Sequence, residues 1–65
     1  MTTRTAFWDG EERRYVVADT GDDHRWYSCD GDEWRDQHGQ AVTSAQFNIS
    51  AITLYGGPRD GEVVA

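Results

Sequence analysis

The sequence predicts a small all-β domain, either an antiparallel sheet or an SH3-like barrel of about five to six short strands, with at most one helical turn. Glycines recur at turn-like intervals, and the segments between them are short and rich in aromatic, β-branched and threonine residues. Short strands separated by such turns are typical of small β domains. The chain has 65 residues and shows no internal repeat or linker, so we expect one domain over residues 1–65.

The first predicted hairpin lies at the N-terminus. We expect one strand near Thr2–Trp8 and a second over about Arg13–Ala18. The dipeptide Asp9-Gly10 lies between them, and both residue types tolerate the positive φ that tight hairpin turns require. These two strands should therefore pair in an antiparallel manner.

The second predicted hairpin turns at Asp30-Gly31. With these two residues as the loop, three pairs of residues face each other: Cys29 with Asp32, Tyr27 with Trp34, and Arg25 with Asp36. Aromatic and opposite-charge pairs of this kind each contribute ~0.2–1 kcal/mol. The same alternation places Trp26 on the face opposite to Tyr27.

The pattern is weaker after Gly39. We expect one helical turn at Ser44–Phe47, capped by Ser44. A strand should follow at Ile49–Tyr55, where alternation directs Ile52 and Leu54 to one face and Tyr55 to the other. A turn-rich segment then leads to a closing strand at Glu62–Val64.

The charge of the chain restricts its partners. The net charge is −6 and the isoelectric point is about 4.5, so nucleic acids and anionic membranes would be repelled. Seven acidic residues fall between residues 19 and 36: Asp19, Asp22, Asp23, Asp30, Asp32, Glu33 and Asp36. This half of the surface either attracts a basic partner or only maintains solubility.

No pattern in the sequence predicts catalysis or a cofactor. Asp19-Thr20-Gly21 resembles the active-site tripeptide of retroviral-type aspartic proteases, but a turn after a strand explains it equally. The spacing of His24, Cys29 and His38 matches no paired metal-ligand pattern. Cys29 is the only cysteine, which fits a reducing compartment. We expect a soluble, cytoplasmic, non-enzymatic protein without metal or cofactor.

Arginine and tryptophan together favour a binding role. All six basic residues are arginines, whose planar side chains both bind carboxylates and stack on aromatic rings. The expected partner-binding surface combines rings, arginines and acidic turn residues: Trp26, Trp34, Arg25, Arg35, Asp22, Asp23, Asp30 and Asp32. Rings would supply buried area and the acids would steer the encounter with a partner that is basic or has a pocket for an aromatic ring.

The C-terminal turn carries a resemblance to known proteins. It consists of Gly56, Gly57, Pro58, Arg59, Asp60 and Gly61, followed by Glu62-Val63-Val64. This segment resembles a strand–turn–strand unit in small β-rich proteins of tailed bacteriophages with GC-rich hosts. Residues 31–42, a strand with a tryptophan followed by an acidic, glycine-containing turn, are similar to a general pattern in the same proteins. The resemblance implies a phage origin, a location in the cytoplasm of the bacterial host and a bacterial host protein as the partner. We expect the residues of the turn to set its geometry first, with Arg59 as the one side chain able to contact a partner.

The sequence thus predicts an acidic binding protein that docks on a host protein and modulates or inhibits it. Three alternatives remain open: a DNA mimic that inhibits a nucleic-acid-binding host protein, an oligomeric nucleotide sponge using Arg59 and Tyr55, and a structural virion protein. A thin sheet with large rings on both faces would leave one face open, so self-association is a further expectation.

Overall fold

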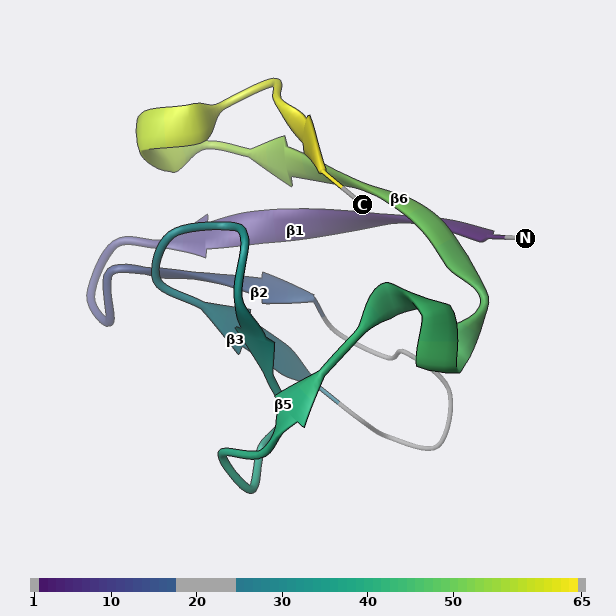
Figure 1. Cartoon of the computed structure of the whole chain (residues 1–65). Coiled ribbons are helices and arrows are strands. Elements are labelled where there is room, and N and C mark those ends of the chain that lie inside the picture. The colour runs from purple at the N-terminus through teal and green to yellow at the C-terminus, as the bar shows by residue number, and fades with distance from the viewer. Residues whose placement is uncertain (1, 18–24, 65) are drawn as a thin grey trace.

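The computed structural model describes residues 2–17 and 25–64. These residues form one seven-stranded sheet, mixed but mostly antiparallel, which curls into a half-barrel (Figure 1). The strands are β1 (Thr2–Asp9), β2 (Arg14–Val17), β3 (Trp26–Ser28), β4 (Trp34–Arg35), β5 (Ala41–Val42), β6 (Ile49–Tyr55) and β7 (Val63–Val64). Two short 3-10 helices, η1 (Ser44–Phe47) and η2 (Gly57–Arg59), complete the fold. The all-β class is confirmed, with more strands and one more helical turn than expected.

The strand order is β5-β4-β3-β2-β1-β6-β7. Strands β1 and β6 pair in parallel over six residue pairs, whereas the other neighbouring strands pair in antiparallel fashion. After β5, at one edge of the sheet, the chain returns through η1 to reach the far side of β1 (Figure 1). This return gives the curled sheet a concave inner face and a convex outer face.

The hydrophobic core fills the inner face. Its buried members are Ala6, Tyr15, Val17, Trp26, Trp34, Ile49, Ile52 and Leu54. Four partly buried side chains pack against them: Trp8, Val42, Phe47 and Val64. The Trp26 ring lies 5.1 Å from the Phe47 ring and 6.3 Å from the Trp34 ring, measured between centroids. The predicted alternation of β6 is confirmed, because Ile52 and Leu54 are fully buried while Tyr55 is exposed.

The predicted register of the second hairpin is wrong by one residue. Tyr27 pairs with Arg35, not with Trp34. The loop spans residues 29–33, whereas the sequence predicts a loop of two residues. One oxygen of the Asp30 carboxylate stabilises this longer loop by accepting hydrogen bonds from the backbone N–H groups of Asp32 and Glu33. Because side chains alternate along a strand, this shift turns Trp34 onto the inner face beside Trp26.

The first hairpin forms as predicted, with its loop one residue later in the chain. Strand β1 pairs with β2 through Trp8 and Tyr15, and the loop spans residues 10–13 instead of 9–12. The positive φ of 58° lies at Arg13 and not in the Asp9-Gly10 dipeptide. Asp9 instead stabilises the loop, because its carboxylate accepts hydrogen bonds from the backbone N–H groups of Glu11 and Glu12. The predicted end of the second strand, Ala18, lies outside the described residues.

The helical turn at Ser44–Phe47 is confirmed, but Thr43 and not Ser44 occupies its N-cap. The Gln46 side chain accepts a hydrogen bond from the Thr43 backbone N–H at 2.8 Å, and the Gln46 N–H donates to the Thr43 carbonyl oxygen. This reciprocal bonding fixes the start of η1.

The C-terminal segment is a turn, as predicted. Its three glycines all have positive φ: 81° at Gly56, 70° at Gly57 and 86° at Gly61. The Gly56 N–H donates to the Asp60 carboxylate at 2.7 Å, and η2 contains Pro58. A Cβ atom on Gly57 would lie 2.5 Å from the indole ring of Trp8, so this glycine lies flat against the ring.

A hydrogen-bonded connection centred on Arg59 joins this turn to the rest of the sheet. The Tyr15 hydroxyl donates to the Gly56 carbonyl and accepts from the Arg59 N–H, both at 2.9 Å. The Arg59 guanidinium donates to the Asp30 carbonyl at 2.7 Å, to Asp32 at 2.9 Å and to Glu62 at 3.1 Å. The Arg59 guanidinium thus holds the β3–β4 loop against the C-terminal turn.

Gly57→Ala should destabilise the fold more than Gly39→Ala. Both glycines have positive φ, at which alanine costs about 1–2 kcal/mol, but no atom lies within 4 Å of a Cβ on Gly39. The contact with Trp8 should add about 1–3 kcal/mol of overpacking at Gly57. Urea unfolding followed by tryptophan fluorescence measures the difference. Equal losses would show that Gly57 is needed only for its φ.

Tyr15→Phe should lower the free energy of unfolding by about 1–3 kcal/mol, because it leaves the Gly56 carbonyl and the Arg59 N–H without their shared partner. Tyr55→Phe is the matched control, since the Tyr55 side chain is exposed. Urea unfolding of the two variants and the wild type tests this. A loss for Tyr15→Phe no larger than for the control would contradict a role of this hydroxyl in closing the fold.

Candidate functional site

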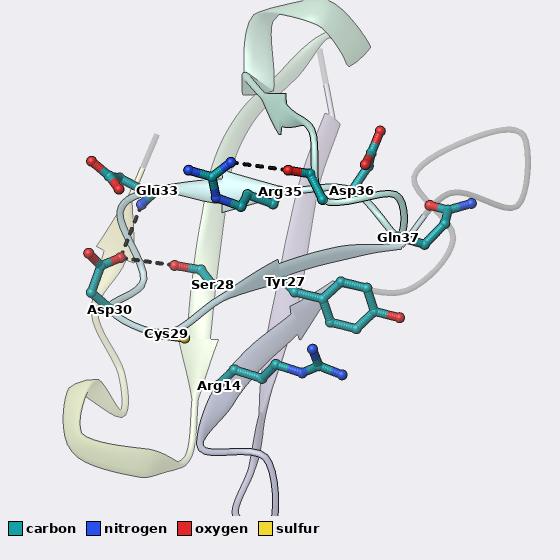
Figure 2. Close-up of a pocket in the computed structure, with 10 residues that line it drawn as sticks. Arg14, Tyr27, Ser28, Cys29, Asp30, Glu33, Arg35, Asp36 and Gln37 are labelled. Carbon is teal, nitrogen blue, oxygen red and sulfur yellow. Dashed lines mark hydrogen bonds between the residues drawn. The ribbon is translucent and has the colours of Figure 1, made fainter.

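A groove of about 480 Å³ lies on the outer face of β2, β3 and β4. Its lining residues are Arg14, Tyr27, Ser28, Cys29, Asp30, Glu33, Arg35, Asp36, Gln37 and Gly39. Figure 2 shows Tyr27 of β3 between Arg14 on one side and Arg35 on the other, with Cys29 just beyond the end of β3. We call this concavity the β3 groove.

The strand register directs these side chains outward. Tyr27 is paired with Val16 on one side and with Arg35 on the other, and paired residues point to the same face of a sheet. The neighbouring residues Trp26 and Trp34 point inward and are buried. The one-residue shift that buries Trp34 is therefore the same shift that sets Arg35 beside Tyr27.

Arg14 and Tyr27 form a cation–π pair at the centre of the groove. The guanidinium carbon of Arg14 lies 4.1 Å from the centre of the Tyr27 ring. A half-buried pair of this kind contributes about 0.5–2 kcal/mol and holds the arginine in position. The Arg14 Nε atom is buried and has no hydrogen-bond partner among the described residues.

Two turns position the other polar residues of the groove. The Asp30 carboxylate accepts hydrogen bonds from the backbone of Asp32 and Glu33 and from the Ser28 hydroxyl, and these bonds lower the pKa of Asp30 to about 2. On the opposite wall, Arg35 donates to the Gly39 carbonyl at 3.1 Å. Both ends of the groove therefore keep their shape through local hydrogen bonds.

The groove carries charges of both signs. Two arginines line it together with three acidic residues, Asp30, Glu33 and Asp36. The ion pairs found among the described residues both involve Arg59, so neither Arg14 nor Arg35 is paired with a described carboxylate. A bound carboxylate would form a charge-assisted hydrogen bond with either guanidinium.

The structure separates the residues that the sequence grouped into one binding surface. Trp26 and Trp34 are 0% and 4% exposed, so their rings belong to the core and not to a docking surface. Arg35 and Asp30 line the groove, whereas Asp32 is ion-paired with Arg59. Arg25 is exposed outside the groove, with its N–H bonded to the Gln37 side chain. Asp22 and Asp23 lie outside the described residues.

Sequence reasoning missed Arg14, Tyr27 and Glu33 as members of one site. The signal was present in the second hairpin, since a register shifted by one residue puts Tyr27 and Arg35 on the same face. The pairing of β2 with β3 brings Arg14 to the Tyr27 ring, and the local sequence pattern does not predict this pairing.

Other kinds of site find little support in the structure. Across residues 2–17 and 25–64, no three His, Cys, Asp or Glu side chains gather closely enough to hold a metal ion. Over the same ranges no helix has the length and apolar character needed to cross a membrane. The tripeptide Asp19-Thr20-Gly21 and the candidate ligand His24 lie outside the described residues.

Comparisons with known proteins add no relative: no protein-family model matches the chain, and neither the curated proteins nor the solved structures include a significant match. Function therefore has to be argued from the geometry and chemistry of the groove. A fold alone does not define an activity, because one fold supports many unrelated sites.

Asp30→Asn should destabilise the protein at neutral pH and lose this effect in acid. The pKa of Asp30 is lowered from 3.8 to about 2, so its charge stabilises the fold above about pH 4 and this contribution is lost as the pH falls through about 2. Urea midpoints of wild type and Asp30→Asn should differ at neutral pH and converge near pH 2. Glu12→Gln, at an exposed position in the other hairpin, is the control. A difference that persists unchanged near pH 2 would refute the role of the charge.

Proposed function

We propose that the chain is a non-enzymatic acidic binding protein that docks on a bacterial host protein through the β3 groove and modulates or inhibits that protein. One observation carries the proposal: two arginines that have no described carboxylate partner flank a tyrosine in an outward-facing groove. Tyrosine and arginine are enriched among the residues that dominate binding energy at protein interfaces.

The charges of the groove indicate what a partner should present. Arg14 and Arg35 suit an acidic side chain, which their guanidinium groups can bind through charge-assisted hydrogen bonds. The net charge of −6 would at the same time steer a partner with a basic surface toward the chain. We therefore expect a basic partner surface with at least one carboxylate that enters the groove.

The groove is better suited to a protein side chain than to nucleotide capture or DNA mimicry. Asp32 is ion-paired with Arg59, and the Asp30 carboxylate is hydrogen-bonded within its own loop, so both are less able to imitate phosphates. The Arg59 guanidinium already has three protein acceptors, which weakens the case for a nucleotide site at this residue. The resemblance of the C-terminal turn to phage proteins is the reason for naming a bacterial host protein.

Arg35→Gln should weaken partner binding at least about tenfold, whereas Arg25→Gln should change it little. Both substitutions remove one exposed positive charge, but only Arg35 lines the groove, and a hydrogen bond to a charged group contributes about 1.5–3 kcal/mol. Host proteins retained by the immobilised wild type are identified by mass spectrometry, and their dissociation constants are then measured for both variants.

The two variants give the measurement a clear negative outcome. Equal affinities of Arg35→Gln and Arg25→Gln for the retained protein would place the interface elsewhere. Retention of no host protein would contradict the proposed function itself. A very steep loss of affinity with salt in both variants would favour DNA mimicry, since that mode depends on many charges at once.

A further inference from the structure

A second surface lies on the outer face of β1, β6 and β7, beside the β3 groove, with Val16 of β2 between Phe7 and Tyr27. Three large apolar side chains are exposed there: Phe7 at 57%, Tyr55 at 64% and Val63 at 62%. We propose that this surface, here called the outer apolar face, binds the same face of a second copy of the chain and forms a two-fold symmetric dimer. This inference is independent of the proposed function.

The strand register makes the face continuous. Phe7 pairs with Tyr55, and their rings meet edge to face with centroids 5.6 Å apart. Thr53 pairs with Thr5 on one side and with Val63 on the other. Because paired residues point to the same face, the three exposed apolar side chains share one surface with the threonines between them.

The face carries little charge in a highly charged chain. Its outward residues are Thr3, Thr5, Phe7, Asp9, Ala51, Thr53, Tyr55 and Val63, whereas 28% of the whole chain is charged. The one carboxylate, at Asp9, lies at the end of β1 and accepts hydrogen bonds from the N–H groups of residues 11 and 12. A second copy presents a surface equally low in charge, and a two-fold interface requires a surface that is complementary to itself.

The small size of the chain and its exposed apolar side chains favour a second copy as the partner of this face. A chain of 65 residues buries a limited core, and small domains often gain stability by oligomerisation. Large exposed apolar patches on soluble proteins commonly mark interaction sites. A dimer through β1, β6 and β7 would bring the second copy close to the β3 groove, because Val16 alone separates Phe7 from Tyr27 across the strands.

The inference predicts an unusual dependence on salt. Each copy carries a net charge of −6, so the two copies repel each other while the apolar side chains of the interface attract them. Screening of the repulsion should therefore strengthen the dimer between about 20 mM and about 500 mM salt. An interface made of ion pairs would weaken over the same range.

Sedimentation equilibrium in reducing buffer, over a series of protein concentrations at both salt concentrations, tests the proposal. The wild type should dimerise, more tightly at high salt. The double variant Phe7→Thr/Tyr55→Thr should dimerise at least about tenfold more weakly, because threonine retains strand propensity but removes both rings. Ala41→Thr, an exposed position on the opposite edge strand, is the matched control and should leave the dimer unchanged.

Two results would overturn the inference: a wild type that stays monomeric under all conditions, or dimerisation that the double variant leaves intact. Circular dichroism checks that each variant is folded, and the single variant Tyr55→Thr serves if the double variant is not. Cys29→Ser should still dimerise, which excludes a disulfide through the exposed Cys29. Arg35→Gln should also dimerise normally, so failure of this proposal and failure of groove docking can be told apart.

Discussion

The parallel pairing of β1 with β6 is the contact on which the rest of the structure depends. It joins residues near the two ends of the chain over six residue pairs, and in the sheet order it alone connects the first five strands to the last two. Such a distant pairing has a high entropic cost of loop closure, which burial must offset. The return of the chain from β5 to β6 brings Phe47 onto Trp26 and completes the inner core.

The hydrogen bonds around Tyr15 and Arg59 connect this core to the outer surface. They tie the C-terminal turn to β2 and to the loop between β3 and β4. That loop determines which side chains of β4 point outward, so the shape of the β3 groove depends on residues that do not line it. Arginine suits this role, because a single planar guanidinium offers donors to several acceptors at once.

The two proposed surfaces of the outer face differ in charge. Over β2 to β4 the face carries arginines and acids around Tyr27, whereas over β1, β6 and β7 it carries threonines and apolar side chains, with Asp9 at the end of β1 as the one charged residue. Charged groups give an interface its specificity, and apolar area gives it binding energy. One curved sheet can thus present a charged docking groove beside an apolar surface for self-association.

The sequence by itself determined the all-β class, the two hairpins, the burial pattern of β6, the turn at Ser44–Phe47 and the glycine turn before β7, because alternation, turn residues and glycine act over a few neighbouring positions. The tertiary structure alone decided that β1 and β6 pair in parallel, that Trp26 and Trp34 are core residues, and that Arg59 is structural. A pattern with a period of two does not specify the partner strand, and a shift of one residue exchanges the two faces. The register of β3 and β4 depends on the Asp30 loop, which Arg59 contacts from 29 positions away in the chain.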